Sequence, residues 1–170
     1  MTLWPKEAVK RAANSLQEFD PEQKVIILDT SARTAKEAAA SLSCEVGAIV
    51  KSLLFKTDNS YILILVAGDK KASLNKIKKI LSIKDMSMAS ADDVKKITGY
   101  TIGGVSPVGH SNKIEIIIDN SLERFKSLFA AAGHPNCVFK TNFLDLKKMT
   151  NGSIKEITEW ENQKYLIIFY

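Results

Sequence analysis

Lys51 lies inside a mainly apolar segment, residues 49–55, and is the only charged residue there. In a β-strand alternate residues share one face, so Lys51 is expected beside Ile49, Leu53 and Phe55. A lysine is rarely buried unless its ammonium group is paired or functional. The alternative is a strand at a sheet edge, from which the long side chain carries its ammonium group into water. The pattern favours Lys51 as a functional residue.

Residues 99–110 contain four glycines and one proline, which suits a loop that binds a ligand through backbone atoms. Glycine allows positive φ and close approach of a ligand, while proline stiffens the chain. The spacing matches neither a Walker loop, which needs Gly-Lys-Ser/Thr, nor a dinucleotide fingerprint, which precedes a helix. An ordinary long turn is the alternative, although long loops in compact domains are uncommon unless they are functional.

Histidine and cysteine give only weak signals of catalysis or metal binding. The chain has two of each, without an HExxH, CxxC or Ser-His-Asp pattern. His110, His134, Cys44 and Cys137 could in principle supply four zinc ligands, but they are too dispersed for a recognised spacing. No pair of carboxylates stands out for acid–base catalysis. We therefore expect no metal and no cofactor.

Asp69 and the lysines that follow it form a third candidate feature. Asp69 ends the second apolar strand, where it can pair with Lys51 across a hairpin or begin a solvated turn. Residues 70–84 carry six lysines and no acid. Lysines make point-charge contacts with phosphates and do not read bases in a bidentate manner, and a solvated helix face is the alternative. The net charge of +5 permits a phosphate-rich partner without proving one.

Hydrophobic periodicity and turn residues predict the elements that must position these side chains. Amphipathic spacing predicts a helix over residues 5–19. A capping box, Thr34 to Glu37, opens a helix that runs to about Leu42. Two apolar strands, 49–56 and 61–67, flank a polar turn and predict a hairpin. Further strands are predicted over residues 25–28, 113–119, 125–132 and 137–140, and further helices over 73–81, 90–99 and 144–149, with an apolar end at 165–170.

Helices and strands alternate irregularly, which excludes the strict βαβ order of a doubly wound sheet. We predict a single α/β domain over residues 1–170, with a curved, mixed, mostly antiparallel sheet surrounded by helices. Its length allows one hydrophobic core, and 45% hydrophobic with 25% charged residues excludes a disordered chain. No apolar run reaches the roughly 18 residues of a membrane span, and no signal-peptide pattern is present. We therefore expect a cytoplasmic protein.

Seven short segments occur in an order that is specific, although each alone is weak: residues 33–39, 49–53, 67–69, 88–90, 98–100, 103–109 and 132–136. Together they resemble the YbaK/EbsC-like family, also called the prolyl-tRNA-synthetase-associated editing domain, over residues 24–157. Members of that family hydrolyse the ester of mischarged aminoacyl-tRNA, either free-standing or inserted in prolyl-tRNA synthetase. The resemblance implies a trans-acting deacylase whose partner is mischarged tRNA, with a synthetase as a second candidate partner. A monomer or weak homo-oligomer is expected.

The resemblance also assigns roles to the residues singled out above. Lys51 corresponds to the family's buried lysine and is the predicted catalytic residue, which would hold the terminal phosphate or the ester carbonyl. The GxxxP loop, Gly103 to Pro107, would hold the aminoacyl group and orient a water. The predicted substrate-binding residues are Asp69, Gly103, Gly104, Val105, Ser106, Pro107, Gly109 and His134. The predicted tRNA phosphate contacts are Lys70, Lys71, Lys76, Lys78 and Lys79.

Direct attack by water without a metal is expected, because no side-chain nucleophile stands out. By resemblance, a 2′-hydroxyl of the tRNA could serve as a base borne by the substrate. The turn at residues 133–135 is more similar to the alanine- or serine/threonine-directed groups than to the cysteine-directed one. The alternatives are a non-catalytic module that binds tRNA or an aminoacyl ligand, and a metal-dependent hydrolase. The apolar tail, residues 160–170, could cover a sheet edge or pack against a second subunit.

Overall fold

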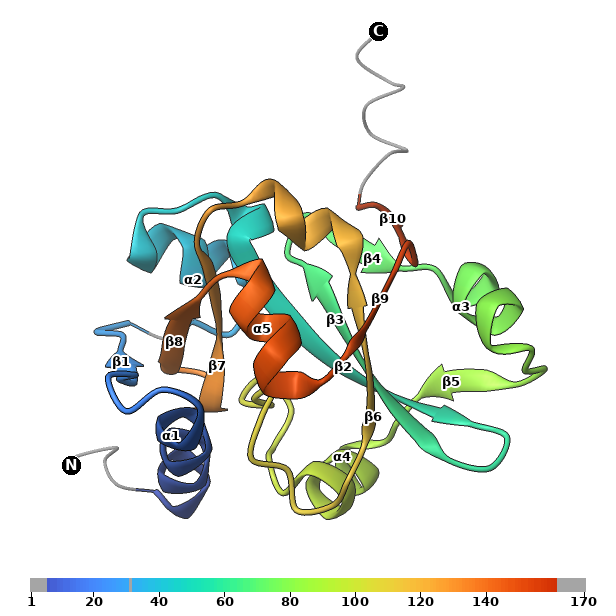
Figure 1. Ribbon diagram of the computed structural model, residues 1–170, viewed down its shortest axis with the longest axis horizontal. Coiled ribbons are helices and arrows are strands. Elements are labelled where there is room, and N and C mark those ends of the chain that lie inside the picture. Colours follow the sequence, from blue (N-terminus) through green and yellow to red (C-terminus); the bar gives the residue numbers. More distant parts are fainter. Residues whose placement is uncertain (1–5, 31, 162–170) are drawn as a thin grey trace, which may run out of the picture.

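The computed structural model describes residues 6–30 and 32–161, which form an α/β unit around a mixed sheet (Figure 1). Its helices are α1 (Glu7–Phe19), α2 (Ala35–Leu42), α3 (Leu74–Leu81), α4 (Ala91–Thr98) and α5 (Phe143–Thr150), with 3₁₀ turns η1 (Val46–Ala48) and η2 (Asn120–Arg124). Its strands are β1 (Ile26–Ile27), β2 (Ile49–Thr57), β3 (Tyr61–Ala67), β4 (Lys70–Ala72), β5 (Met86–Met88), β6 (Glu115–Asp119), β7 (Leu128–His134), β8 (Cys137–Thr141), β9 (Ser153–Lys155) and β10 (Thr158–Trp160). In this part of the chain no helix is long and apolar enough to cross a membrane.

Eight strands form the main sheet, in the order β1-β8-β7-β2-β3-β6-β9, and β5 pairs with the far end of β2. The β2–β3 and β7–β8 hairpins are antiparallel, as are the β1–β8 and β2–β5 pairs. The pairs β2–β7, β3–β6 and β6–β9 are parallel. Strands β4 and β10 form a separate antiparallel pair. The predicted α/β fold with a mixed sheet is therefore confirmed.

The centre of the sheet is buried on both faces, which explains the uninterrupted apolar run of β3. Every residue from Ile62 to Ala67 is at most 2% exposed. One set of alternate β3 side chains packs with α1, α4 and α5, and the other set packs with Ile77 of α3 and with Ile157. A rigid strand β3 thus supports its neighbour β2.

Local signals predict the helix ends well. Thr34, Ser73 and Ser90 each accept a hydrogen bond from the backbone N–H three residues later and cap α2, α3 and α4. Gly99 ends α4 with a φ of 80°. The sequence pattern does not reveal β4, β5, β9 or β10, because three residues are too few to show a period. Strand β7 begins at Leu128 and not at residue 125, because residues 125–127 form a bend after η2. Residues 165–170 lie outside those described.

The glycine-rich loop after α4 is tied to the N-terminal helix. Arg11 of α1 donates from Nε to the Gly109 carbonyl at 2.9 Å and from Nη2 to the Gly99 carbonyl at 2.7 Å. Its guanidinium carbon also lies 4.7 Å from the centre of the Tyr100 ring. Tyr100 is fully buried and donates to the Val108 carbonyl at 2.7 Å. One side chain therefore holds both ends of the loop.

A fully buried carboxylate, Asp119 at the end of β6, anchors the C-terminal segment. It accepts hydrogen bonds from the Ile157 N–H and the Thr158 hydroxyl, both at 2.9 Å. It also accepts from the Ser121 N–H at 3.1 Å and from the Ser121 hydroxyl. These donors offset the cost of burying a charge. The contacts set the position of β10 and of Glu161.

Substituting Asp119→Ala is expected to lower the free energy of unfolding by about 3 kcal/mol, because it leaves several buried donors without an acceptor. Urea denaturation would measure the change. Glu115→Ala, an exposed position on the same strand, is the matched control and should stay within about 0.5 kcal/mol. Equal losses in the two variants would contradict the anchoring role.

His110 gives the fold a predicted dependence on pH. Burial lowers its pKa below the ordinary 6.5; a hydrogen bond with the Ser106 carbonyl opposes this shift, and the nearby charge of Arg11 adds to it. Between the folded pKa and 6.5 the unfolded chain binds a proton that the folded chain does not. Stability should therefore fall as the pH drops through 6.5, and level off below the folded pKa.

His110→Gln keeps an amide donor for the Ser106 carbonyl and removes the titration. The free energy of unfolding of the wild type should fall more than that of the variant between pH 7.5 and pH 5.5. Parallel losses in the two proteins would show that His110 is not responsible.

Candidate active site

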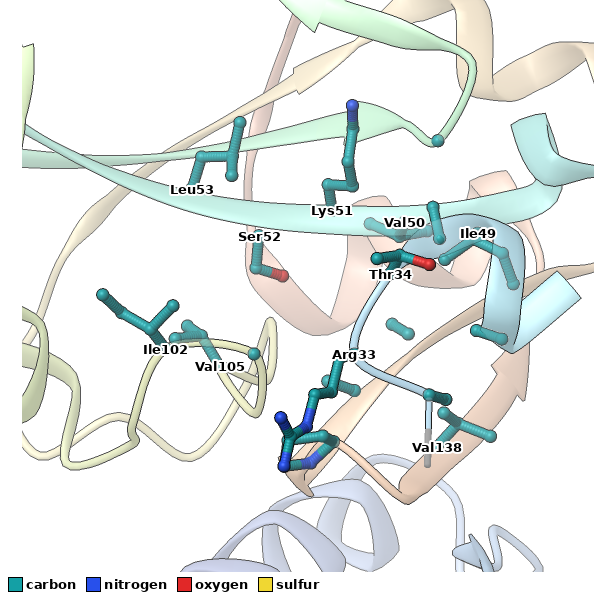
Figure 2. A pocket seen from close by; sticks show the side chains of 18 of the residues that line it. Arg33, Thr34, Ile49, Val50, Lys51, Ser52, Leu53, Ile102, Val105 and Val138 are labelled. Atoms are coloured by element: carbon teal, nitrogen blue, oxygen red, sulfur yellow. The ribbon is translucent and has the colours of Figure 1, made fainter. Parts of the chain in front are cut away.

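A cavity of about 500 Å³ opens between the start of α2, strand β2, the glycine-rich loop and β7 (Figure 2). Its walls are mainly apolar and include Ile49, Leu54, Val94, Ile102, Val105 and Phe129. Arg33, Thr34 and Lys36 from the start of α2 contribute polar groups, as does Ser52 of β2. Apolar walls with a few placed polar groups are typical of sites for small molecules.

The cavity meets an edge of β2 that no strand covers in the described part of the chain. Strand β7 pairs with β2 only at residues 49–50, and β5 pairs only at residues 55–57. Leu54 directs its carbonyl to this edge, where it accepts from the Ala89 N–H at 3.0 Å. Because alternate residues turn their backbone groups to the same edge, Ser52 presents its N–H and C=O there. The sheet thus opens to leave a polar backbone segment in an apolar cavity.

Ser52 also carries a hydroxyl without a hydrogen-bond partner among the described residues, although its Oγ is buried. The side chain leaves β2 on the side of Arg33, Ile102 and Val105 (Figure 2). A buried hydroxyl without a partner costs free energy. A ligand that supplied the missing hydrogen bond would recover that cost. One residue therefore offers a ligand an N–H, a C=O and a hydroxyl.

The GxxxP loop forms another wall of this cavity. Gly103, with a φ of 90°, and Val105 line it directly. Gly104 allows the loop to contact the β7–β8 turn, because a Cβ at this position would lie only 2.9 Å from the backbone of His134. The structure therefore brings Gly103 and Val105 of the predicted substrate-binding set to the cavity and uses Gly104 for close packing.

The rest of the predicted loop residues support this wall from behind. Ser106 and Pro107 are buried and do not line the cavity. The Ser106 carbonyl lies 2.6 Å from Nε2 of His110. Gly109 has a φ of 75°, and a Cβ there would lie 2.6 Å from the Tyr100 hydroxyl. These residues hold the loop in one shape.

His134 is the last residue of β7, while its neighbour Pro135, in the β7–β8 turn, lines the cavity. Nδ1 of His134 accepts a hydrogen bond from the Asn136 N–H at 3.1 Å. Burial lowers the pKa of His134, and the charge of Lys6 lowers it further. The ring is therefore neutral near pH 7, and direct contact between His134 and a substrate stays a prediction.

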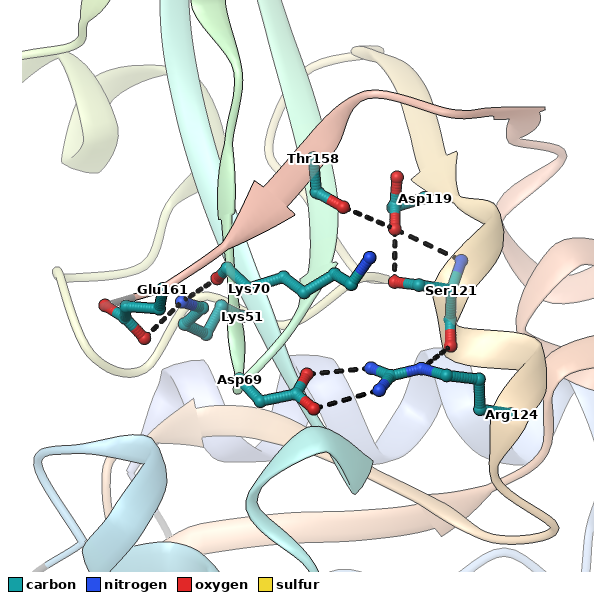
Figure 3. Close-up of polar contacts among 8 residues, drawn as sticks. All are labelled: Lys51, Asp69, Lys70, Asp119, Ser121, Arg124, Thr158 and Glu161. Atoms are coloured by element: carbon teal, nitrogen blue, oxygen red, sulfur yellow. Dashed lines mark hydrogen bonds and ion pairs between the residues drawn. The ribbon is translucent and has the colours of Figure 1, made fainter. Parts of the chain in front are cut away.

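Lys51 leaves β2 on the side opposite Ser52, so its ammonium group points away from the GxxxP loop (Figure 2). Its side chain is 24% exposed. Its Nζ donates to the Lys70 carbonyl at 2.5 Å and lies 3.7 Å from a carboxylate oxygen of Glu161. Figure 3 draws both contacts. Both Lys51 and Glu161 contribute to the cavity lining. This ion pair therefore stands at the edge of the cavity, on the other side of the strand from Ser52.

Asp69 does not pair with Lys51; of the two possibilities that the sequence leaves open, it takes the turn, between β3 and β4. It accepts two hydrogen bonds from the guanidinium of Arg124, at 2.7 and 2.9 Å (Figure 3). Burial raises the pKa of Asp69, but the hydrogen bonds and charge of Arg124 outweigh burial and lower it overall. Asp69 lies beyond the cavity lining. A bidentate pair with arginine has the geometry that a single lysine ammonium cannot match.

The predicted phosphate-binding lysines differ in how free their charges are. Lys71 lies 3.3 Å from a carboxylate oxygen of Glu159, and Lys76 lies 3.6 Å from one of Glu156. Lys78 and Lys79 lie in the last turn of α3, where a positive charge interacts favourably with the helix dipole. Two members of the set therefore share their charge with carboxylates, and the phosphate contacts stay a prediction.

Within the described ranges, no three or more His, Cys, Asp or Glu residues gather in a way that could hold a metal ion. The four dispersed ligands of the zinc alternative are thus not brought together. His134 and Cys137 face each other across the β7–β8 hairpin. Burial raises the pKa of the Cys137 thiol, while the charge of Lys6 opposes the rise.

The sequence pattern does not identify the arginines of the site, yet their rarity is a usable signal. The chain has only three, Arg11, Arg33 and Arg124. Arg11 holds the loop, Arg33 lines the cavity, and Arg124 binds Asp69. Two of these contacts join residues 98 and 55 positions apart. No local pattern carries such information.

Known proteins match this chain over the segments that form the cavity. The family profile described as the aminoacyl-tRNA editing domain matches residues 29–149. The chain is 30% identical over 141 residues to a proline–tRNA ligase of Caldicellulosiruptor bescii, which covers 82% of this chain and 24% of that protein. It is 30% identical over 157 residues to YwhH of Bacillus subtilis, an uncharacterized protein, which covers 91% of this chain and 99% of that protein. A crystal structure of a protein proposed as a trans-editing enzyme for prolyl tRNA synthetase has a TM-score of 0.86 at 32% identity, covering 91% of this chain and 98% of that one.

The chain spans about a quarter of the synthetase that it matches and nearly the whole of the two smaller relatives. The matched residues include α2, β2, the GxxxP loop and β7. These are the elements that enclose the cavity. The chain belongs to the aminoacyl-tRNA editing domain family.

Proposed function

We propose that the protein is a trans-acting aminoacyl-tRNA deacylase, which hydrolyses the ester between an incorrect amino acid and the 3′ end of tRNA. The observation that carries the proposal is the open edge of β2 inside a mainly apolar cavity. There Ser52 offers backbone groups and a hydroxyl opposite the GxxxP loop. Membership of an editing family supports the proposal, as does likeness to a protein proposed as a trans-editing enzyme.

In this mechanism the aminoacyl group enters the cavity and its carbonyl oxygen accepts a hydrogen bond from the Ser52 N–H. A donor fixed at that position stabilises the negative charge that develops on the oxygen. Water attacks the carbonyl carbon, and the bond from that carbon to the ribose oxygen breaks. A proton of the water passes to the leaving ribose oxygen, with the adjacent ribose hydroxyl as relay. The GxxxP loop holds water and ester in contact, and the step uses no metal or cofactor.

Lys51 acts on the nucleotide and not on the amino acid. Its ammonium group stands at the edge of the cavity on the opposite side of β2 from Ser52. A phosphate that arrived with the terminal nucleotide would replace Glu161 as the anionic partner of Lys51. The flexible lysine stem permits that exchange without movement of the strand.

The substrate amino acid is small. A volume of about 500 Å³ holds such an amino acid together with part of the terminal ribose, but the volume does not by itself select for size. The choice of alanine, serine or threonine rests on the turn at residues 133–135, which is similar to that of the groups directed at these amino acids. The free hydroxyl of Ser52 would distinguish among them, because a site that hydrogen-bonds a substrate hydroxyl discriminates against analogues without it.

The first test is deacylation of tRNA charged with alanine, serine, threonine or cysteine, with correctly charged prolyl-tRNA as the control. The wild type is expected to hydrolyse one or a few of the small esters at the same rate with and without a chelator. Lys51→Ala should lower kcat/KM about 100-fold, because it removes the cation that holds the phosphate of the terminal nucleotide. Lys51→Arg, which keeps the charge, should lose less.

Failure to hydrolyse any of these esters while tRNA still binds would replace the proposal with a non-catalytic tRNA-binding module. Loss of activity with the chelator, restored by added metal, would favour a metal-dependent hydrolase.

Ser52→Ala tests the hydroxyl separately from the backbone. The variant should unfold within about 1 kcal/mol of the wild type, because the hydroxyl it removes makes no hydrogen bond in the described part of the chain. Its kcat/KM should fall about 10-fold more for seryl- or threonyl-tRNA than for alanyl-tRNA. An equal effect on all three esters would mean that Ser52 does not read the side chain of the substrate.

A further inference from the structure

Trp160 is an exposed aromatic residue beside the cavity that the proposed reaction does not use. It is the last residue of β10, and 43% of its surface is exposed. In the β4–β10 pair it lies opposite Lys70.

The ring is held in place by two cations. Nζ of Lys70 lies 4.2 Å from the centre of the ring, and the guanidinium carbon of Arg124 lies 5.0 Å from it. Arg124 is itself fixed by its two bonds to Asp69 and by a 2.7 Å bond to the Ser121 carbonyl. Because the ring is fixed before any partner arrives, binding costs little side-chain entropy.

This aromatic surface is continuous with the edge of the cavity. Lys51 donates to the carbonyl of Lys70, the residue opposite Trp160, and pairs with Glu161, the residue after Trp160. Lys51 and Glu161 also line the cavity. A chain whose end entered the cavity would therefore pass over Lys51 and reach Trp160.

Charge alone does not make this surface a strong site for phosphates. Lys71, Lys51 and Arg124 each face a carboxylate within 4 Å, from Glu159, Glu161 and Asp69. Lys70 faces no carboxylate within that distance in the described part of the chain. Recognition here needs an aromatic contribution as well as one cation.

We propose that Trp160 stacks against an unpaired base of an RNA strand whose 3′ end lies in the cavity, and that Lys70 contacts the adjoining phosphate. Stacking on an aromatic side chain tolerates any base, which suits a terminal sequence shared by all tRNAs. The inference rests on the proposed function for its strand direction. It adds a residue outside the family match at residues 29–149.

The test uses the Trp4→Phe background, in which Trp160 is the only tryptophan of the chain. An uncharged single-stranded RNA ending in CCA is titrated against tryptophan fluorescence, and a blunt RNA duplex of the same length is the control. The single strand should quench the fluorescence and bind more tightly than the duplex. Trp160→Ala should weaken binding of the strand about 5- to 150-fold, measured by anisotropy of a labelled RNA.

Three further variants separate stacking from other causes. Trp160→Phe keeps an aromatic face and should bind within about 3-fold of the wild type. Phe19→Ala removes another exposed aromatic side chain, at the end of α1, and should leave binding unchanged. Glu161→Gln should strengthen binding, because it removes the carboxylate that competes with phosphate. Unchanged binding in Trp160→Ala would overturn the proposal.

Two substrates distinguish failure of this inference from failure of the proposed function. An aminoacyl-adenosine fills the cavity alone, whereas charged tRNA also crosses Trp160. Trp160→Ala should slow hydrolysis of charged tRNA and leave hydrolysis of the adenosine ester unchanged. Equal rates for variant and wild type on both substrates would reject the stacking role and keep the deacylase. Quenching by RNA without hydrolysis of either ester would do the reverse.

Discussion

The gap along one edge of β2 is the constraint on which the rest of the structure depends. Strand β7 leaves β2 after residue 50, and β5 joins it only at residue 55. Backbone groups without partners are costly inside a protein, so such a gap needs support from all sides. Strand β3, buried on both faces, holds β2 from behind, and the loop clamped by Arg11 closes the front. The cavity and its hydrogen-bonding groups are therefore products of the same interruption.

The sequence predicts most of the fold because most of its signals are local. Side-chain caps at Thr34, Ser73 and Ser90 and the β2–β3 hairpin depend on residues a few positions apart. The gap cannot be predicted in this way, because it depends on where β5 and β7, which are distant in sequence, begin and end beside β2. For the same reason the sequence pattern predicts a functional role for Lys51 but not for Ser52. The role of Ser52 arises because neither β5 nor β7 pairs with β2 at that residue.

Asp69 shows how a plausible local pair loses to a distant one. Lys51 and Asp69 lie on the same hairpin, but Lys51 is opposite Val66, which leaves Asp69 beyond the end of β3. Arg124 reaches Asp69 from another part of the chain and binds both carboxylate oxygens. Lys51 is left with a carbonyl and the partly exposed Glu161, a weaker set of partners.

Arg11 lies outside the 29–149 segment that defines the family, yet it binds both ends of the loop that shapes the cavity. Anyone who trims this protein to its family core, or transplants that core into a larger chain, would cut away this arginine. The central strands of the sheet would remain, but the cut would also remove β1, β9, β10 and the buried face of α1, so both the stability of the fold and the order of the loop would fall. The segment that matches the family and the segment that the cavity needs thus have different boundaries, because the second includes helix α1.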